Sequence, residues 1–176
     1  TTYTVKMYSP KSTLSRSVVS TEINRQLDNI NNQMSSHIET SNLSLFNRSD
    51  TKEWVEIPVE LYTVIKEALR INELSDNAFD ISIGPVVNLW GFGPVSENRL
   101  AIPTEDEIKR TLEQVGMNQL EIMDGYRIRK KRPDLQIDLS ASAKGEIIDQ
   151  VCQLLDRRGL ENYLVEIGGE IRARGN

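Results

Sequence analysis

The sequence predicts an α+β domain, a sheet of mixed strands with packed helices, from three observations. Short segments of alternating apolar residues are interspersed with longer segments in which apolar residues recur every three or four positions. Turns containing glycine or proline separate these segments. The chain has 176 residues, of which 38% are hydrophobic and 27% charged, and this length and composition are typical of one globular domain.

The first half of the chain alternates strands and helices. In order, the sequence predicts a strand at 3–7, a helix at 23–35, a connector at 41–47, a strand at 53–58, a helix from 58 and a strand at 79–83. Pro58 marks a helix start because proline is favoured in the first turn. The strand at 79–83 is expected to lead into a long loop, since glycines and prolines crowd residues 84–94.

The second half has clearer boundaries. In order, the sequence predicts a helix from 104 to 116, a hairpin at 120–128, a strand at 135–139, a helix ending at 159 and a strand at 163–167. Thr104 and Glu107 form a capping-box pattern, and Asp124-Gly125 is a typical hairpin turn. The last three elements have the order and length of a parallel βαβ unit.

Several function classes are disfavoured by composition. The net charge of -5 argues against nucleic-acid binding. A single histidine, His37, builds neither a Ser-His-Asp triad nor a multi-histidine metal site. The basic residues 127–132 are interpreted as the solvated edge of the hairpin, and Cys152 as a buried apolar residue. No apolar stretch reaches the roughly 18 residues of a membrane span, and no targeting signal is apparent.

The loop "DLSASAKG", residues 138–145, is a candidate phosphate site. Its small side chains let a ligand approach the backbone, the following helix offers free N–H groups, and Lys144 adds a positive charge. The alternative is a tight turn with Ser142 as an ordinary N-cap, and a Ser142–Lys144 dyad is a weaker possibility. The P-loop pattern is absent, and Ala141 stands where an S-x-x-K pattern needs serine.

Two further segments leave alternatives open. Trp90 and Phe92 lie among glycines and form either an aromatic platform for a planar ring or a loop folded onto the core. Asp80 either caps the backbone or contacts a ligand. Gly168 and Gly169 indicate a turn with positive φ or a close approach to a ligand.

Four segments in this order resemble the ApbE family of FAD:protein FMN transferases across residues 1–176: "MSSHIETSNLSLFN", "AFDISIGPVVNLWGFGP", "IDLSASAKGEIIDQVCQLL" and "NYLVEIGGEIRARG". The resemblance implies a single ApbE-like, T-fold-related domain over residues 1–176, truncated before a C-terminal metal-binding block. It implies a Mg²⁺-dependent enzyme that cleaves the pyrophosphate of FAD, releases AMP and links FMN by a phosphoester to a threonine of an acceptor flavoprotein. The implied setting is the bacterial periplasm, with a lipid anchor to the inner membrane.

The resemblance also assigns residues. It implies FAD contacts at His37, Ala78, Phe79, Asp80, Asp138 and Lys144, and a magnesium contact at the carbonyl of Ala141. No catalytic side chain is expected, because the acceptor threonine is the nucleophile. His37 stands where the family usually has tyrosine. Side-chain magnesium ligands are expected beyond Asn176, so the chain by itself should lack turnover.

Two other functions are compatible with the same residues. A non-catalytic FAD-binding periplasmic protein would share all four segments. A structural domain would need the glycine-rich loops only as turns.

Overall fold

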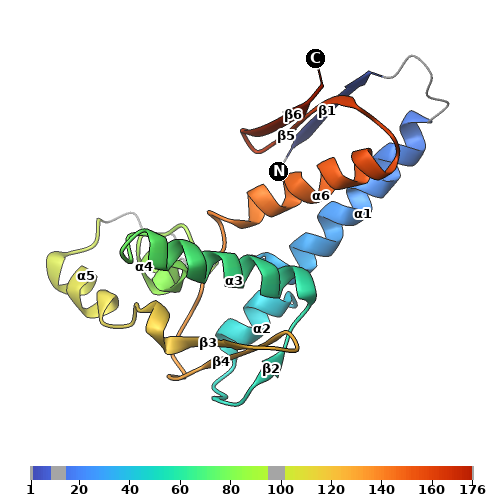
Figure 1. Cartoon of the computed structure of the whole chain (residues 1–176). Helices are drawn as coiled ribbons and strands as arrows, with labels where there is room; N and C mark the ends of the chain where they lie inside the picture. The colour runs from blue at the N-terminus through green and yellow to red at the C-terminus, as the bar shows by residue number, and fades with distance from the viewer. Residues whose placement is uncertain (1, 9–14, 95–101, 176) are drawn as a thin grey trace. The chain divides into compact units, whose positions relative to one another are not determined.

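The computed structural model describes residues 2–8, 15–94 and 102–175. The chain divides into two compact units, Thr1–Asn31 with Ser140–Asn176, and Asn32–Leu139, each described by itself below. Figure 1 shows that helices and strands occur together in both units, so the predicted α+β class is confirmed.

The first unit is built on a three-stranded antiparallel sheet. Its strands are β1 (Tyr3–Tyr8), β5 (Asn162–Ile167) and β6 (Glu170–Arg174), in the order β1-β5-β6. Tyr163, Val165 and Ile167 are buried and alternate with more exposed residues, as expected for a strand with one covered face. The helix α6 (Ala143–Arg157) packs on β5 and β6, and most of α1 (Arg16–Met34) belongs to the same unit.

Two predictions for this unit are confirmed. Gly168 and Gly169 have φ values of 59° and 93° and connect β5 to β6 in a hairpin. Glycine adopts this left-handed backbone without the steric cost of a side chain. Cys152 is buried in α6, and burial raises the pKa of its thiol.

The predicted parallel βαβ unit is wrong. Residues 135–139 form no strand, and β5 pairs antiparallel with β1 and β6. The apolar alternation arises because Leu135, Ile137 and Leu139 are buried in the second unit. A side chain, Asn47, bonds to both backbone groups of Ile137, so this extended segment satisfies part of its backbone without a neighbouring strand.

The second unit combines helices with a second antiparallel sheet of order β2-β4-β3. Its elements are α2 (Asn42–Arg48), β2 (Val55–Glu56), α3 (Val59–Leu74), the 3₁₀ helix η1 (Ile81–Ile83), α4 (Gly84–Leu89), α5 (Glu105–Leu112), the 3₁₀ helix η2 (Met117–Gln119), β3 (Leu120–Met123) and β4 (Arg127–Lys130). The predicted hairpin is confirmed as β3 and β4. The capping box of Thr104 and Glu107 is also confirmed, although α5 ends before the predicted Gly116.

The connector predicted at 41–47 is mostly helical, since α2 spans Asn42–Arg48. The hydroxyl of Ser41 accepts a hydrogen bond from the Ser44 N–H at 3.0 Å, which caps the first turn of α2. Leu43 and Phe46 are three positions apart and both buried. A side-chain cap and one apolar face are sufficient for this helix of two turns.

Residues 79–83 form no strand, contrary to the prediction. The Asp80 carboxylate accepts from the N–H of Ser82 at 2.7 Å and from its hydroxyl at 2.5 Å, which starts η1. Pro85 then lies in the first turn of α4, where its missing N–H costs nothing. Local capping therefore outweighs the alternation of apolar residues.

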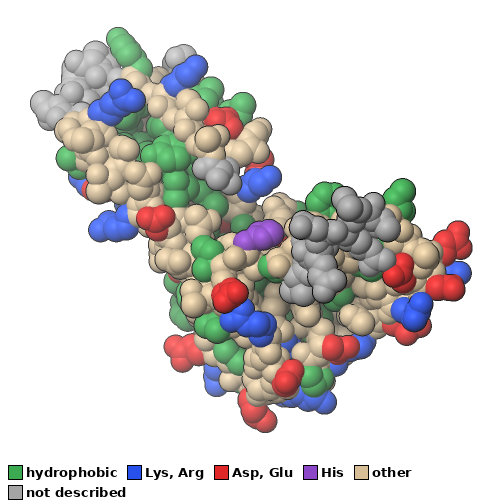
Figure 2. Space-filling model, turned by 180° about the vertical axis from the view of Figure 1, so that it is seen from behind, with side chains coloured by type: hydrophobic (Ala, Val, Ile, Leu, Met, Phe, Trp, Pro, Cys, Tyr) green, Lys and Arg blue, Asp and Glu red, His purple; other side chains and the backbone are tan. Residues whose placement is uncertain are grey.

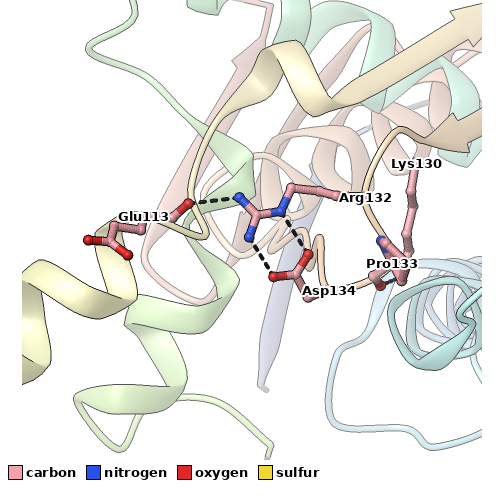
Figure 3. A network of polar contacts seen from close by, with 5 residues as sticks. All are labelled: Glu113, Lys130, Arg132, Pro133 and Asp134. Carbon is pink, nitrogen blue, oxygen red and sulfur yellow. Dashed lines mark hydrogen bonds and ion pairs between the residues drawn. The ribbon is translucent and has the colours of Figure 1, made fainter.

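Lys130 is a charged residue in the core of the second unit. The predicted solvated edge is wrong for this residue, because β4 is the central strand and Lys130 is only 1% exposed. Its Nζ donates to the carbonyls of Asn47 and Ser49 at 2.9 Å and of Pro133 at 3.2 Å. Figure 3 shows Lys130 reaching toward Pro133. Burial lowers the pKa of Lys130.

Among the described residues, no helix combines the length and the apolar character that a transmembrane span requires.

Candidate functional site

A pocket of about 300 Å³ lies within the second unit. It is formed by the loop after α1, by α2, by α4 with the loop that follows it, and by the extended segment that ends the unit. Its lining residues are Ser36, His37, Glu39, Ser44, Asn47, Arg48, Gly84, Asn88, Pro94, Gln136, Ile137 and Asp138. Because these residues are far apart in sequence, the pocket forms only when the unit folds.

The helix α2 fixes the loop that carries His37. The Ser44 hydroxyl lies 3.2 Å from the carbonyl oxygen of Ser35 and 3.1 Å from that of Ser36, and donates to this pair. The Ser41 hydroxyl donates to the Ser35 carbonyl at 2.6 Å. Two serines of one helix turn therefore hold consecutive carbonyls of the loop, which positions one wall of the pocket.

Asn47 holds another part of the pocket wall. Its Oδ1 accepts from the Ile137 N–H at 2.9 Å, and its Nδ2 donates to the Ile137 carbonyl at 2.8 Å. Gly84 completes this wall, since a Cβ at this position would lie 3.0 Å from the carbonyl oxygen of Gln136. The close approach of α4 to the extended segment therefore depends on a glycine.

The structure brings together two of the residues expected to contact FAD. His37 and Asp138 both line the pocket, although they are about 100 positions apart in sequence. His37 is exposed, and Figure 2 shows this single histidine at the surface of the second unit. Asp138 is partly buried, and its N–H donates to the Ile81 carbonyl at 2.7 Å.

Ala78, Phe79 and Asp80 belong to the same unit but do not line this pocket. The Phe79 carbonyl accepts a hydrogen bond from Asn72 at 2.7 Å, and the Asp80 carboxylate caps η1. Of the two roles left open for Asp80, the structure shows the cap. The FAD contacts expected at these three residues stay predictions.

Ala141 and Lys144 belong to the first unit. Both are exposed, Ala141 in the turn before α6 and Lys144 in the first turn of the helix. Ser142 is the N-cap residue, but its side chain makes no capping hydrogen bond. The phosphate site expected at this helix start stays a prediction.

Of the two alternatives left open for Trp90 and Phe92, folding onto the core is wrong. Trp90 is 44% and Phe92 76% exposed. Neither residue lines the pocket.

The pocket has a mixed charge. Its lining residues include the acidic Glu39 and Asp138, the basic Arg48 and the histidine His37. The Arg48 guanidinium donates to the Glu39 carbonyl, which holds it beside the loop. Within residues 2–8, 15–94 and 102–175, no group of three or more His, Cys, Asp or Glu residues is arranged to bind a metal.

Sequence reasoning missed the pocket residues Asn47, Asn88 and Gln136. Asn47 was assigned to a connector, so its position on a helix facing the extended segment was not anticipated. The sequence signal that could have revealed this helix is Ser41. Serine is a favoured N-cap residue, and here its side chain accepts from the N–H of Ser44. Asn88 and Gln136 meet only in the folded unit and leave no local pattern.

Comparisons of the sequence with known proteins all point to one family. The sequence matches the ApbE family over residues 1–176. The FAD:protein FMN transferase of Vibrio cholerae serotype O1 is 41% identical over 175 residues, which cover 99% of this chain and 52% of that protein. The FAD:protein FMN transferase of Haemophilus influenzae is 37% identical over 180 residues, covering 99% of this chain and 52% of that protein.

A solved structure agrees with the sequence comparisons. The structure of the flavin transferase ApbE from Vibrio cholerae is similar with a TM-score of 0.94 and 40% identity, covering 98% of this chain and 55% of that one. The chain thus spans about half the length of the curated relatives it matches. The family match over the whole sequence, together with this similarity of fold, shows that the chain belongs to the ApbE family.

Proposed function

We propose that the protein containing this chain is an FAD:protein FMN transferase. The observation that carries the proposal is the pocket, which joins His37 and Asp138, two residues expected to contact FAD, in a chain whose relatives bear that name. Exposed Ala141 and Lys144 support it, since a phosphate-binding loop must be accessible.

In the proposed reaction, a hydroxyl oxygen of the acceptor protein forms a bond to the phosphorus of the FMN moiety of FAD. The bond from that phosphorus to the bridging oxygen breaks, AMP leaves with that oxygen, and the hydroxyl proton passes to the solvent. We propose threonine as the acceptor residue. Phosphoryl transfer depends mainly on positioning and charge neutralisation, so the enzyme needs no nucleophilic side chain.

The chain's own residues have two roles in this proposal. Lys144 and the N–H groups at the start of α6 would neutralise the charge of the diphosphate. The pocket of the second unit, with His37 among its lining residues, would hold a ring of the nucleotide.

We propose Mg²⁺ as the metal ion, because hard oxygen ligands suit it and phosphoryl transfer requires charge neutralisation. The carbonyl of Ala141 would be one ligand. Among the residues that the structure describes, no three His, Cys, Asp or Glu residues are arranged to hold a metal ion. When bound, the ion would neutralise the developing charge on the phosphate oxygens.

We also propose that the protein acts in the bacterial periplasm, attached to the inner membrane through a lipid. Cell fractionation of the native host, followed by release of the protein with detergent but not with salt, would support this location. Recovery with cytoplasmic proteins would contradict it.

The second candidate is a non-catalytic FAD-binding periplasmic protein. The four segments that resemble the family are equally compatible with this alternative. The pocket would then bind FAD without cleaving it.

The experiment that separates the two functions uses the full-length protein, FAD, MgCl₂ and an acceptor flavoprotein subunit. The transferase releases AMP and leaves flavin fluorescence on the acceptor band in a denaturing gel. An acceptor whose target threonine is replaced by alanine should remain unlabelled. Binding of FAD without AMP release or labelling would favour the carrier, and absence of FAD binding would reject both.

A further inference from the structure

Two amide side chains form a pair in the wall of the pocket. Asn88 lies on α4 and Gln136 lies in the extended segment, and both line the pocket. The Nδ2 of Asn88 donates to the Oε1 of Gln136 at 3.1 Å. This bond uses the oxygen of Gln136, so Gln136 presents its Nε2 donor.

The Asn88 amide donates to Gln136 at the expense of folding stability. Its Oδ1 is buried and has no hydrogen-bond partner in the described part of the chain. A buried acceptor without a partner is destabilising, because it has lost its hydrogen bonds to water. The loop after α4 covers this oxygen closely, since a Cβ on Gly93 would lie only 1.8 Å from it. Because the unpaired Asn88 oxygen destabilises the fold, its presence needs an explanation, and a role in function is one.

We propose that Gln136 is a specificity-determining residue of this pocket and that Asn88 positions it. In this inference, the Nε2 of Gln136 donates a hydrogen bond to an in-plane acceptor atom on a heterocyclic ring of the bound flavin nucleotide. Asn88 holds the Gln136 oxygen and so turns the Nε2 toward the ligand. The inference rests on the proposed function, because it assigns a ring of FAD to the pocket.

The pocket has the size for a single ring system, and either ring of FAD could provide the acceptor. A volume of about 300 Å³ lies at the lower end of the range for ligand pockets. Both the adenine and the isoalloxazine ring carry in-plane acceptors, namely ring nitrogens or carbonyl oxygens. Separate titrations with AMP and FMN therefore identify which ring occupies the pocket.

The first test is Asn88→Leu in the full-length protein. Leucine keeps the branched heavy-atom shape of asparagine, with larger methyl groups, and removes the unpaired oxygen, so the protein should remain folded with a thermal stability close to that of the parent. FAD binding, measured by calorimetry, should weaken about tenfold, because Gln136 is no longer oriented. The affinity for either AMP or FMN should fall in parallel, and the affinity for the other should not change.

A matched control comes from the other buried amide with an unpaired oxygen. Gln33 has an Oε1 without a partner among the described residues, and its Nε2 donates to Glu60 at 3.2 Å. Gln33 does not line the pocket. Gln33→Leu should therefore leave FAD affinity unchanged, whatever its effect on stability.

Gln136→Met provides a second variant that removes the donor itself and keeps a similar shape. It should weaken FAD binding by at least as much as Asn88→Leu. If both variants are folded and bind FAD as the parent does, the inference is wrong and the proposed function stands. If the parent protein binds no FAD, the proposed function fails together with the inference.

Discussion

At the scale of single residues, the most unusual side chain is the buried Lys130. An isolated ammonium group in a protein interior is costly because it loses its hydration. Here its three N–H donors meet three backbone carbonyls, and the Phe46 ring centroid lies 5.1 Å from Nζ. One lysine therefore joins the end of α2, the strand β4 and the turn after it.

We predict that Lys130→Met lowers the free energy of unfolding by about 2–4 kcal/mol. Methionine fills a similar volume but leaves buried carbonyls unpaired, and each such group costs about 1–3 kcal/mol. Chemical denaturation monitored by circular dichroism measures the change. Lys66→Met on the exposed surface of α3 is the matched control, and it should change stability by no more than about 0.5 kcal/mol. Equal stability of the two variants would show that the interior tolerates the loss of Lys130.

The residues of the candidate site were predictable only in part. His37 and Asp138 belong to segments whose resemblance to a family is visible in sequence, and both line the pocket. The bond between Asn47 and Ile137 joins residues 90 positions apart. No periodicity or local motif records such a contact, because it is made by tertiary folding alone.

At the scale of elements, the errors of prediction have a common physical cause. Residues 79–83 and 135–139 both show the apolar alternation of strands, but neither finds a strand to pair with. Asp80 bonds the Ser82 N–H and Asn47 bonds both backbone groups of Ile137. One backbone hydrogen bond, from the Asp138 N–H to the Ile81 carbonyl, joins the two segments. Alternation reports which side chains are buried, and it does not reveal the hydrogen-bond partner of the backbone.

The extended segment gives the second prediction, Asn47→Ala. Removing the amide leaves the N–H and carbonyl of Ile137 without their side-chain partner. We expect the free energy of unfolding to fall by about 1–3 kcal/mol and FAD affinity to fall with it, since the segment forms a pocket wall. Asn47→Asp keeps the acceptor for the Ile137 N–H but sets a carboxylate oxygen against the Ile137 carbonyl, so it should be no more stable than Asn47→Ala. Unchanged stability of Asn47→Ala would show that the paired hydrogen bonds do not support this segment.

The helix α5 gives the third prediction, Thr104→Ala. None of the eight residues of α5 is buried, so tertiary packing contributes little and the capping box is its main local support. The substitution should destabilise the helix by about 1 kcal/mol and speed amide hydrogen exchange within α5. Thr63→Ala is the control, because its hydroxyl donates to the Val59 carbonyl inside α3 and caps no helix end. Faster exchange throughout the second unit, and not mainly in α5, would contradict this local effect.

At the scale of the whole molecule, composition and periodicity were sufficient for the α+β class but not for the topology. The βαβ prediction assumed that consecutive elements pair. In the first unit, β5 instead pairs with β1, from the opposite end of the chain, at the register Val165 opposite Val5. Such a long-range pairing brings the N-terminal strand into the sheet, and a sequence pattern gives no information about its partner.

The fourth prediction concerns the pH dependence of global unfolding and rests on Tyr163 in the first unit. Its hydroxyl donates to Asp156 at 2.8 Å, and burial, followed by the hydrogen bond to Asp156, raises the pKa of Tyr163 to about 12 from 10.0. Between these values the unfolded state has lost a proton that the folded state retains. The free energy of unfolding should therefore fall as pH rises from 10 to 12, by at most ~3 kcal/mol.

Urea unfolding at pH 9, 10, 11 and 12 tests this prediction in the parent and in Tyr163→Phe. Phenylalanine has no ionisable proton, so the variant should be less stable than the parent at pH 9, and the difference should shrink as the pH rises toward 12. Tyr8→Phe is the control, because Tyr8 is 68% exposed and its removal should leave the parent's pH profile intact. A constant difference between Tyr163→Phe and the parent across this range would mean that the Tyr163 proton is not linked to folding. In that case its hydroxyl would contribute only a hydrogen bond of fixed strength.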